Sequence, residues 1–287
     1  MKELVILSGK GGTGKTTIAG SLAVLAQKKV LADCDVDAPD LHLLLHPEIM
    51  EEGDFWSGKI AVIDKEKCIE CGECERICNF EAIKEGQVDE LDCEGCGLCA
   101  HICPVEAITM KDKIAGKWFI SKTPYGLLVH ARLKIGEGNS GKLVAEVRRR
   151  ARDLAEREGI ELIISDGPPG IGCPVISSLS GAALALLIAE PTASGVHDLQ
   201  RIIELCRHFQ IPALVCINKF DLNEKKSEEI RALCQNYNLD VVAEIPFDKA
   251  VPEAISQGIP PVIYSEGPAS REIKRLWDFI CRFLENR

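Results

Sequence analysis

The chain has 287 residues, of which 46% are hydrophobic and 27% charged, so it can form one large α/β domain or two smaller ones with a buried core. Its 44 acidic and 34 basic residues give a net charge of −10, which argues against a nucleic-acid binder because phosphate backbones require clustered Lys and Arg. The longest uncharged apolar run, 181–189, has nine residues, about half of the ~20 that span a bilayer. The N-terminus has no signal-peptide pattern, and we therefore expect a cytoplasmic protein without a membrane role.

The first 35 residues predict a strand, a glycine-rich loop, a helix and a second strand. Residues 4–7 form a continuous apolar run, as is typical of a parallel strand buried on both faces. Residues 18–27 are rich in Ala and Leu and favour a helix, and residues 30–32 predict the second strand.

The loop between the first strand and the helix matches the phosphate-binding pattern G-x-x-x-x-G-K-[ST] over residues 9–16. Its glycines allow backbone N–H groups to turn toward phosphate oxygens, and the N-terminus of the helix adds its dipole. Lys15 is expected to reach the β and γ phosphates, and the Thr16 hydroxyl to bind Mg²⁺. We predict that ATP or ADP with Mg²⁺ is held here by Gly11, Gly12, Thr13, Gly14, Lys15, Thr16 and Thr17.

A second lysine in this loop, Lys10, makes it similar to the deviant Walker A ATPases. This group includes the MinD and ParA partitioning proteins, the Mrp-type iron–sulfur carriers and the nitrogenase iron protein. In that family the corresponding lysine reaches across a dimer interface to the partner's nucleotide. The resemblance implies that Lys10 is catalytic and that the chain forms an ATP-dependent homodimer, whereas the alternative is an exposed lysine of a surface loop.

Carboxylates follow two predicted strands, at the positions where members of this family carry their switches. Asp33, Asp35 and Asp37 follow the second strand, and Asp166 follows the apolar run 162–164. Carboxylates beside a Mg²⁺-bound triphosphate can hold metal-bound waters and position the attacking water. The resemblance assigns Asp35 to the attacking water, and Asp33 and Asp166 to Mg²⁺ through water. Asp37 either belongs to this site or is a solvated turn residue.

Eight of the 14 cysteines lie between residues 68 and 103, in two runs of the same spacing. Two runs of C-x2-C-x2-C-x3-C are the pattern of bacterial ferredoxins with two [4Fe–4S] clusters, in which the fourth cysteine of each run ligates the other cluster. One cluster would be held by Cys68, Cys71, Cys74 and Cys103, and the other by Cys93, Cys96, Cys99 and Cys78. Zinc is the alternative, although structural zinc usually takes two separated C-x2-C pairs.

The segment around these cysteines is acidic, since residues 60–115 contain 13 acidic and six basic side chains. An acidic face would suit docking to a basic redox partner, and the alternative is that it serves solubility alone. Asn79 stands where the second run has Pro104, which changes the surroundings of the Cys78 thiolate.

Strand and helix patterns alternate again beyond this segment. Residues 141–159 predict a long helix, and further strands are predicted at 162–164, 183–189, 213–217, 241–245 and 262–264, with helices at 198–209, 225–236 and 250–257. Seven short buried strands with intervening helices predict a mostly parallel, doubly wound α/β sheet of the P-loop NTPase type. We expect residues 1–58 and 114–287 to form this ATPase domain, and residues 59–113 to form an inserted α+β ferredoxin-like domain.

The resemblance also implies contacts with the base of the nucleotide, since residues 218–221 are similar to the family's base-contacting segment. Asn218 follows a strand at the edge where open α/β sheets bind ligands, and its amide can both donate to and accept from adenine. Pro246 and Asp248 follow the next strand and would flank the base. The apolar stripe of the last helix, within 271–284, favours packing on the sheet, the alternative being a MinD-like membrane helix.

The resemblance to MinD-type ATPases, together with the cysteine runs, implies a partner-stimulated ATPase whose nucleotide state controls electron transfer through two [4Fe–4S] clusters to a redox partner protein. One alternative is ATP-dependent assembly or delivery of iron–sulfur clusters to an acceptor protein. The other is MinD-like positioning on a membrane or a partner.

Overall fold

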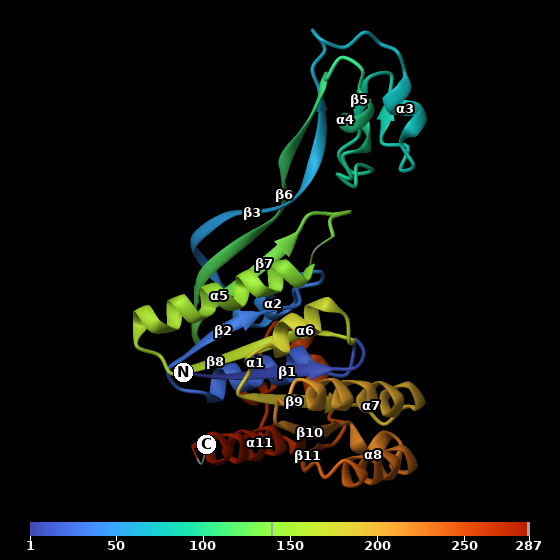
Figure 1. Ribbon diagram of the computed structural model, residues 1–287. Coiled ribbons are helices and arrows are strands. Elements are labelled where there is room, and N and C mark those ends of the chain that lie inside the picture. Colours follow the sequence, from blue (N-terminus) through green and yellow to red (C-terminus); the bar gives the residue numbers. More distant parts are fainter. Residues whose placement is uncertain (139, 286–287) are drawn as a thin grey trace. The chain divides into compact units, whose positions relative to one another are not determined.

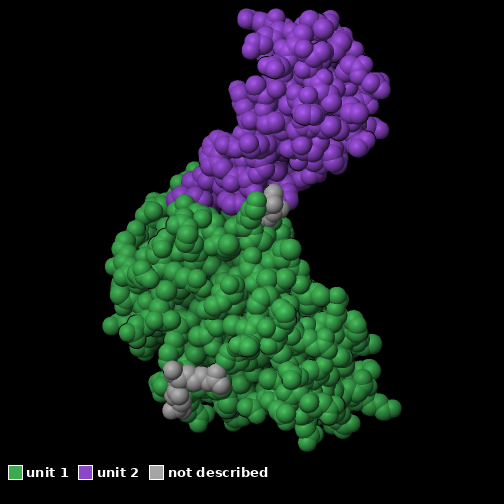
Figure 2. All heavy atoms as spheres, viewed as in Figure 1, with its two compact units in different colours: residues 1–52, 119–131, 140–287 green, residues 53–118, 132–139 purple. Residues whose placement is uncertain are grey.

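The computed structural model describes residues 1–138 and 140–285 (Figure 1). Contacts within the chain divide it into two compact units (Figure 2). Unit 1 contains residues 1–52, 119–131 and 140–287, and unit 2 contains residues 53–118 and 132–139. Unit 2 thus includes every residue of the predicted insert, 59–113, and extends beyond it on both sides.

A nine-stranded sheet has the order β11-β10-β9-β1-β8-β2-β7-β6-β3. The central strand β1 (Lys2–Ser8) pairs in parallel with β8 (Leu162–Pro169) and β9 (Leu184–Ala189). The other parallel pairs are β2–β8, β2–β7, β9–β10 and β10–β11. The remaining strands are β2 (Lys29–Asp33), β3 (Glu48–Ile63), β6 (Ile108–Thr123), β7 (Gly126–Leu133), β10 (Ala213–Asn218) and β11 (Val241–Ile245). The predicted mostly parallel α/β sheet is therefore confirmed.

Both faces of the sheet in unit 1 are covered by helices, because successive side chains of a strand point to opposite faces. Leu4 and Ile6 of β1 belong to one buried core, with α1 (Lys15–Leu25), α2 (Leu41–Leu45), α10 (Pro261–Tyr264) and α11 (Pro268–Glu285). Val5 and Leu7 belong to the other, with α6 (Cys173–Leu179), α7 (Ala193–His208) and α8 (Glu224–Asn236). The helix α5 (Ser140–Glu158) packs against α6 and β2, and the short helices η1 (Phe220–Leu222) and α9 (Ala250–Ser256) follow β10 and β11.

One predicted strand is wrong, and three strands of the nine-stranded sheet were not predicted. Residues 262–264 lie in the helix α10, which Pro261 can begin because its fixed φ suits the first helical position. The unpredicted strands of that sheet are β3, β6 and β7. The side chains of β3 are mostly exposed, so its 16 residues show no buried apolar run.

The last helix packs in the core of unit 1, as the sequence favoured. Ile273, Leu276, Ile280 and Leu284 of α11 are buried there, and Trp277 packs against them. No helix among residues 1–138 and 140–285 is long and apolar enough to cross a membrane.

Unit 2 is built around a structural repeat in which equivalent residues are 25 positions apart. Each copy has a short helix that begins after a glycine in the left-handed region, α3 (Glu73–Ile77) after Gly72 and α4 (Leu98–Ile102) after Gly97. Glu81 and Glu106 also correspond, both with a φ of 52°. Between the copies, β4 (Ile83–Lys84) and β5 (Gln87–Val88) form an antiparallel pair.

Candidate functional site

The phosphate loop connects β1 with α1 at the carboxyl end of the central strand, which is where open α/β sheets bind ligands. Gly12 and Gly14 have φ values of 79° and 91°, a region that strongly favours glycine. Gly14 is the N-cap of α1, so Lys15 is the first residue of that helix. A Cβ at Gly9 would lie 2.4 Å from the Cβ of Asp198, so this glycine is required by close packing with α7.

Lys15 is buried and faces carboxylates of the two predicted switch segments. Its Nζ is 2.7 Å from Oδ1 of Asp166 and 4.0 Å from Oδ2 of Asp35. Burial by itself would lower the pKa of Lys15, but the attraction of Asp166, Asp35 and Asp33 outweighs it and raises this pKa. Lys15 therefore remains an ammonium group that is available to a phosphate.

Asp33 and Asp166 lie beside each other because β2 and β8 are parallel neighbours whose register pairs these two residues. Asp33 accepts hydrogen bonds from the backbone N–H groups of Asp35, at 3.1 Å, and Leu41, at 3.3 Å. Burial and the charge of Asp166 raise the pKa of Asp33 well above its usual value. Burial also raises the pKa of Asp35, although Lys15 opposes this. The site thus concentrates negative charge where a cation would relieve it.

Two buried polar atoms of this site have no hydrogen-bond partner, Oδ2 of Asp166 and Oγ1 of Thr13. Orphaned buried oxygens are costly, and they fit a site that is completed by a ligand. No group of three or more Asp, Glu, His or Cys side chains in the described part of the chain is arranged to hold a metal ion by itself. Mg²⁺ usually keeps several waters and binds through one or two carboxylates and substrate phosphates, and its predicted partners here are Thr16, Asp33 and Asp166.

Lys10 contacts two residues that sequence analysis missed. Its Nζ donates to Oγ1 of Thr192 at 3.0 Å and lies 3.3 Å from Oε2 of Glu190. Lys219 pairs with the same carboxylate at 2.8 Å. Burial opposes ionisation of Glu190, but Lys219 and Lys10 together lower its pKa. The available signal was the position of Glu190 and Thr192 directly after β9, at the ligand-binding edge of the sheet.

The residues predicted to contact the base have partners within the chain. Nδ2 of Asn218 donates to the carbonyl oxygen of Thr13 at 2.7 Å. Asp248 accepts from the N–H groups of Ala250, at 2.9 Å, and Ala269, at 3.4 Å, which ties the segment after β11 to the start of α11. Pro246 lines an open hollow together with Phe220 and Arg271. Their contacts with a base remain a prediction.

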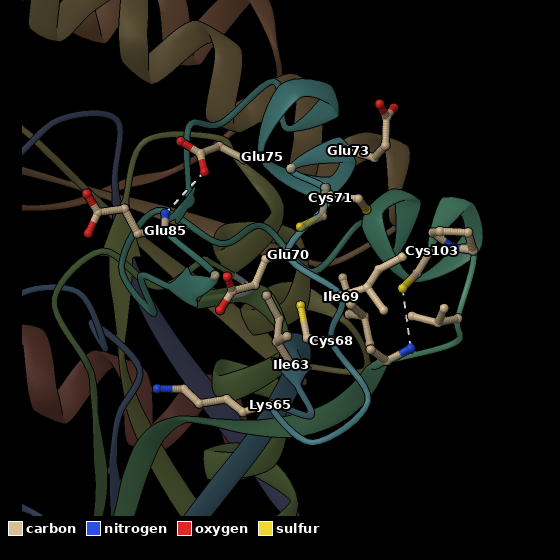
Figure 3. Close-up of a pocket in the computed structure, with 17 residues that line it drawn as sticks. Ile63, Lys65, Cys68, Ile69, Glu70, Cys71, Glu73, Glu75, Glu85 and Cys103 are labelled. Atoms are coloured by element: carbon tan, nitrogen blue, oxygen red, sulfur yellow. Dashed lines mark hydrogen bonds between the residues drawn. The ribbon is translucent and has the colours of Figure 1, made fainter.

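The eight clustered cysteines of unit 2 line two separate cavities. The larger, of about 380 Å³, is lined by Cys68, Cys71, Cys74 and Cys103. The smaller, of about 40 Å³, is lined by Cys78, Cys93, Cys96 and Cys99. Each cavity therefore combines three cysteines of one run with the fourth cysteine of the other. Figure 3 shows the sulfur atoms of Cys68 and Cys103 at the larger cavity.

The donors around these cavities fit iron–sulfur cubes. All 14 cysteines, which lie within the described residues, are free thiols. Each of the four cysteine thiolates binds a different iron of the cube. The four cysteine sulfur atoms therefore need not converge on one point, as they would around a single metal ion. The Cys103 sulfur also accepts a hydrogen bond from the N–H of Ala107 at 3.3 Å, the kind of contact that tunes a cluster's reduction potential.

The surroundings of the two cavities differ. The larger is rimmed by charged side chains, among them Lys65, Glu70, Glu73, Glu75 and Glu85. The smaller is enclosed mainly by apolar side chains, among them Ile77, Phe80, Leu98 and Met110. Asn79 lines the smaller cavity, and Pro104 the larger.

Comparisons with known proteins agree with the fold of unit 1. A protein of Methanocaldococcus jannaschii that is named uncharacterized is 36% identical over 286 residues, which cover 98% of this chain and 97% of that protein. An iron–sulfur cluster carrier protein of Pyrococcus horikoshii is 23% identical over 50% of this chain and 53% of the carrier. The structure of the septum site-determining protein MinD of Pyrococcus horikoshii, complexed with Mg-ADP, is 17% identical with a TM-score of 0.62, and the match covers 99% of this chain and 97% of MinD. The model of the CobQ/CobB/MinD/ParA nucleotide binding domain matches residues 4–262, so this chain belongs to that family.

Proposed function

We propose that this protein hydrolyses ATP and that its nucleotide state controls electron transfer through two [4Fe–4S] clusters. The observation that carries this proposal is that one chain combines a phosphate loop with its buried lysine and carboxylates, and two cavities lined by complete sets of four cysteines. Each cluster, when bound, would supply one-electron chemistry, and Mg²⁺ would offset phosphate charge.

The residues of unit 1 would divide the work of hydrolysis. Lys15 would exchange its contact with Asp166 for the β and γ phosphates, and this would free Asp166 to hold a water of Mg²⁺. Thr16 would bind Mg²⁺ through its hydroxyl. Asp35, which is partly exposed beside Lys15, would orient the water that attacks the γ phosphate.

Lys10 would act in an ATP-dependent homodimer, as the resemblance to MinD-type ATPases implies. In the single chain its ammonium is held by Thr192 and Glu190. Dimerisation would move this charge to the partner's nucleotide. The acidic rim of the larger cavity would then suit a redox partner with a basic surface.

A path for coupling begins at Asp33. One oxygen of this carboxylate accepts from the N–H of Leu41, the first residue of α2. Leu44 of α2 packs so closely on α1 that a Cβ at Gly20 would lie 2.9 Å from it. A change in the position of the Asp33 carboxylate at the Mg²⁺ site would therefore displace α2. In the chain, α2 is followed by His46, Pro47 and the strand β3.

Electron paramagnetic resonance of the reduced protein tests this function. We expect MgATP to change the spectrum or the midpoint potential of at least one cluster, and Lys15→Ala to abolish that change while both clusters remain. Spectra and potentials that do not respond to MgATP in a protein that hydrolyses it would contradict the coupling. A protein without iron that still splits ATP would contradict the redox role.

A second candidate is ATP-dependent delivery of clusters, which is favoured by the partial similarity to iron–sulfur cluster carrier proteins. Transfer of radioactive iron to an acceptor protein without its cluster would distinguish the two. Delivery predicts transfer that depends on MgATP, whereas electron transfer predicts that the iron stays bound.

A further inference from the structure

Asn218 lies at the end of β10 and is buried against the phosphate loop, with 8% of the residue's surface exposed. Its Nδ2 donates to the carbonyl oxygen of Thr13 at 2.7 Å, and this contact is itself buried. The same nitrogen would lie 2.3 Å from a Cβ at Gly14. Asn218 is therefore packed against the last two loop residues before α1.

The geometry of a peptide unit gives this contact a consequence for the loop. The carbonyl of Thr13 and the N–H of Gly14 belong to one peptide unit, and no described peptide bond is cis. In a planar trans unit these two groups point in opposite directions. A donor that holds the Thr13 carbonyl on one side therefore directs the Gly14 N–H to the other side.

The orientation of this peptide is not secured by the helix. Gly14 precedes the first turn of α1, where N–H groups have no partner within the helix. A φ of 91° at Gly14 belongs to a region in which glycine is conformationally free. An external donor is therefore needed to select one orientation, and Asn218 supplies it.

We propose that Asn218 is a positioning residue that directs the Gly14 N–H toward the phosphates of the bound nucleotide. This inference rests on the proposed nucleotide site and differs from a contact with the base. The segment on the base side is held by another side chain, since Asp221 accepts from the N–H of Phe247 at 2.7 Å.

The test compares Mg-ADP with Mg-tripolyphosphate, a ligand that has phosphates but neither ribose nor base. Calorimetric titration of the full chain is expected to show that Asn218→Ala weakens both ligands by the same factor, about tenfold, as for the loss of one buried hydrogen bond. Asn218→Asp keeps the shape but places an acceptor against the Thr13 carbonyl, and should weaken both at least as much. Asn223→Ala, at the exposed N-cap of α8, is the matched control and should leave both affinities unchanged.

A positioning role of Asn218 and a contact of Asn218 with the base predict different affinities of the variants for tripolyphosphate. A tripolyphosphate affinity within about threefold of the wild type, in variants that bind ADP weakly or normally, would overturn the positioning role. Asn218→Asp answers the question if Asn218→Ala does not fold, because its side chain is isosteric. Wild-type protein that binds neither ligand would refute the proposed nucleotide site itself, a result distinct from failure of the variants.

Discussion

Single residues of the nucleotide site hold charge that the fold by itself does not compensate. Asp33, Asp35 and Asp166 gather around one ammonium, that of Lys15, and burial raises the pKa of both Asp33 and Asp35. Oδ2 of Asp166 has no partner. A bound cation would relieve this charge, and we propose that binding of Mg²⁺ and nucleotide uses this relief to order the segments that follow β2 and β8.

Replacement of Asp35 tests this balance. Because the pKa of Asp35 is raised in the folded protein, folding favours the protonated carboxyl. The free energy of unfolding of the wild type therefore decreases as the pH rises from the ordinary pKa of an Asp to the raised pKa of Asp35. Asp35→Asn should therefore be more stable than wild type at pH 7.5 without nucleotide, and the difference should shrink toward about pH 4. Thermal unfolding of both proteins from pH 4 to 8 measures it. A variant that is less stable at every pH would show that the carboxylate is a net stabilising group.

At the scale of elements, the two cysteine runs depend on backbone conformations that glycine provides. Gly72 and Gly97 precede α3 and α4 in the left-handed region. Gly95, with a φ of 66°, also lies against the backbone of Lys59, whose carbonyl oxygen would be 2.2 Å from a Cβ. Its counterpart in the first run is Glu70, with a φ of 53°, so only the second run has this close approach.

Gly95→Ala should therefore disturb the smaller cavity, which Gly95 itself lines. We expect a loss of about 2 kcal/mol or more in the stability of this segment, and iron content reduced toward that of one cluster. Gly138→Ala is the control, since a Cβ there meets no atom within 4 Å. Equal iron content in both variants would show that the loop tolerates the backbone displacement that a Cβ at position 95 requires.

At the scale of the whole molecule, the arrangement of cysteines decides which variants should behave alike. Cys71 and Cys103 come from different runs but line one cavity, and Cys96 and Cys78 line the other. If each cavity holds one cluster, Cys71→Ser and Cys103→Ser should perturb the same cluster, whereas Cys96→Ser and Cys78→Ser should perturb the second.

Paramagnetic resonance of the four reduced variants would measure this pairing. Cys71→Ser and Cys103→Ser should retain the same cluster spectrum, and Cys96→Ser and Cys78→Ser should retain the other. If Cys78→Ser instead gave the spectrum of Cys71→Ser, a residue of the same run, the assignment of ligands to cavities would be contradicted. Bound zinc in place of iron after anaerobic purification would contradict the clusters themselves.

Predictions from the sequence were most successful for features that depend on residues close together in the chain. The phosphate loop, the spacing of the cysteines, and the six strands from β1 and β2 to β8–β11 are properties of short segments, and their patterns survive in a linear sequence. The helix α10 was predicted as a strand because a short apolar run such as Val262, Ile263 and Tyr264 is compatible with either a helix or a strand. The helix is decided by tertiary packing, since α10 contacts α11 and Val262 is buried in the same core.

The tertiary structure alone determined the contacts between distant segments. Lys10 meets Glu190 and Thr192, and Asn218 meets Thr13, because the order of the sheet places β9 beside β1 and β10 beside β9. No local pattern encodes that order, since β1, β9 and β10 are each buried on both faces. The sequence by itself therefore determined the chemical groups of this protein, and the packing of the sheet decided which of those groups meet.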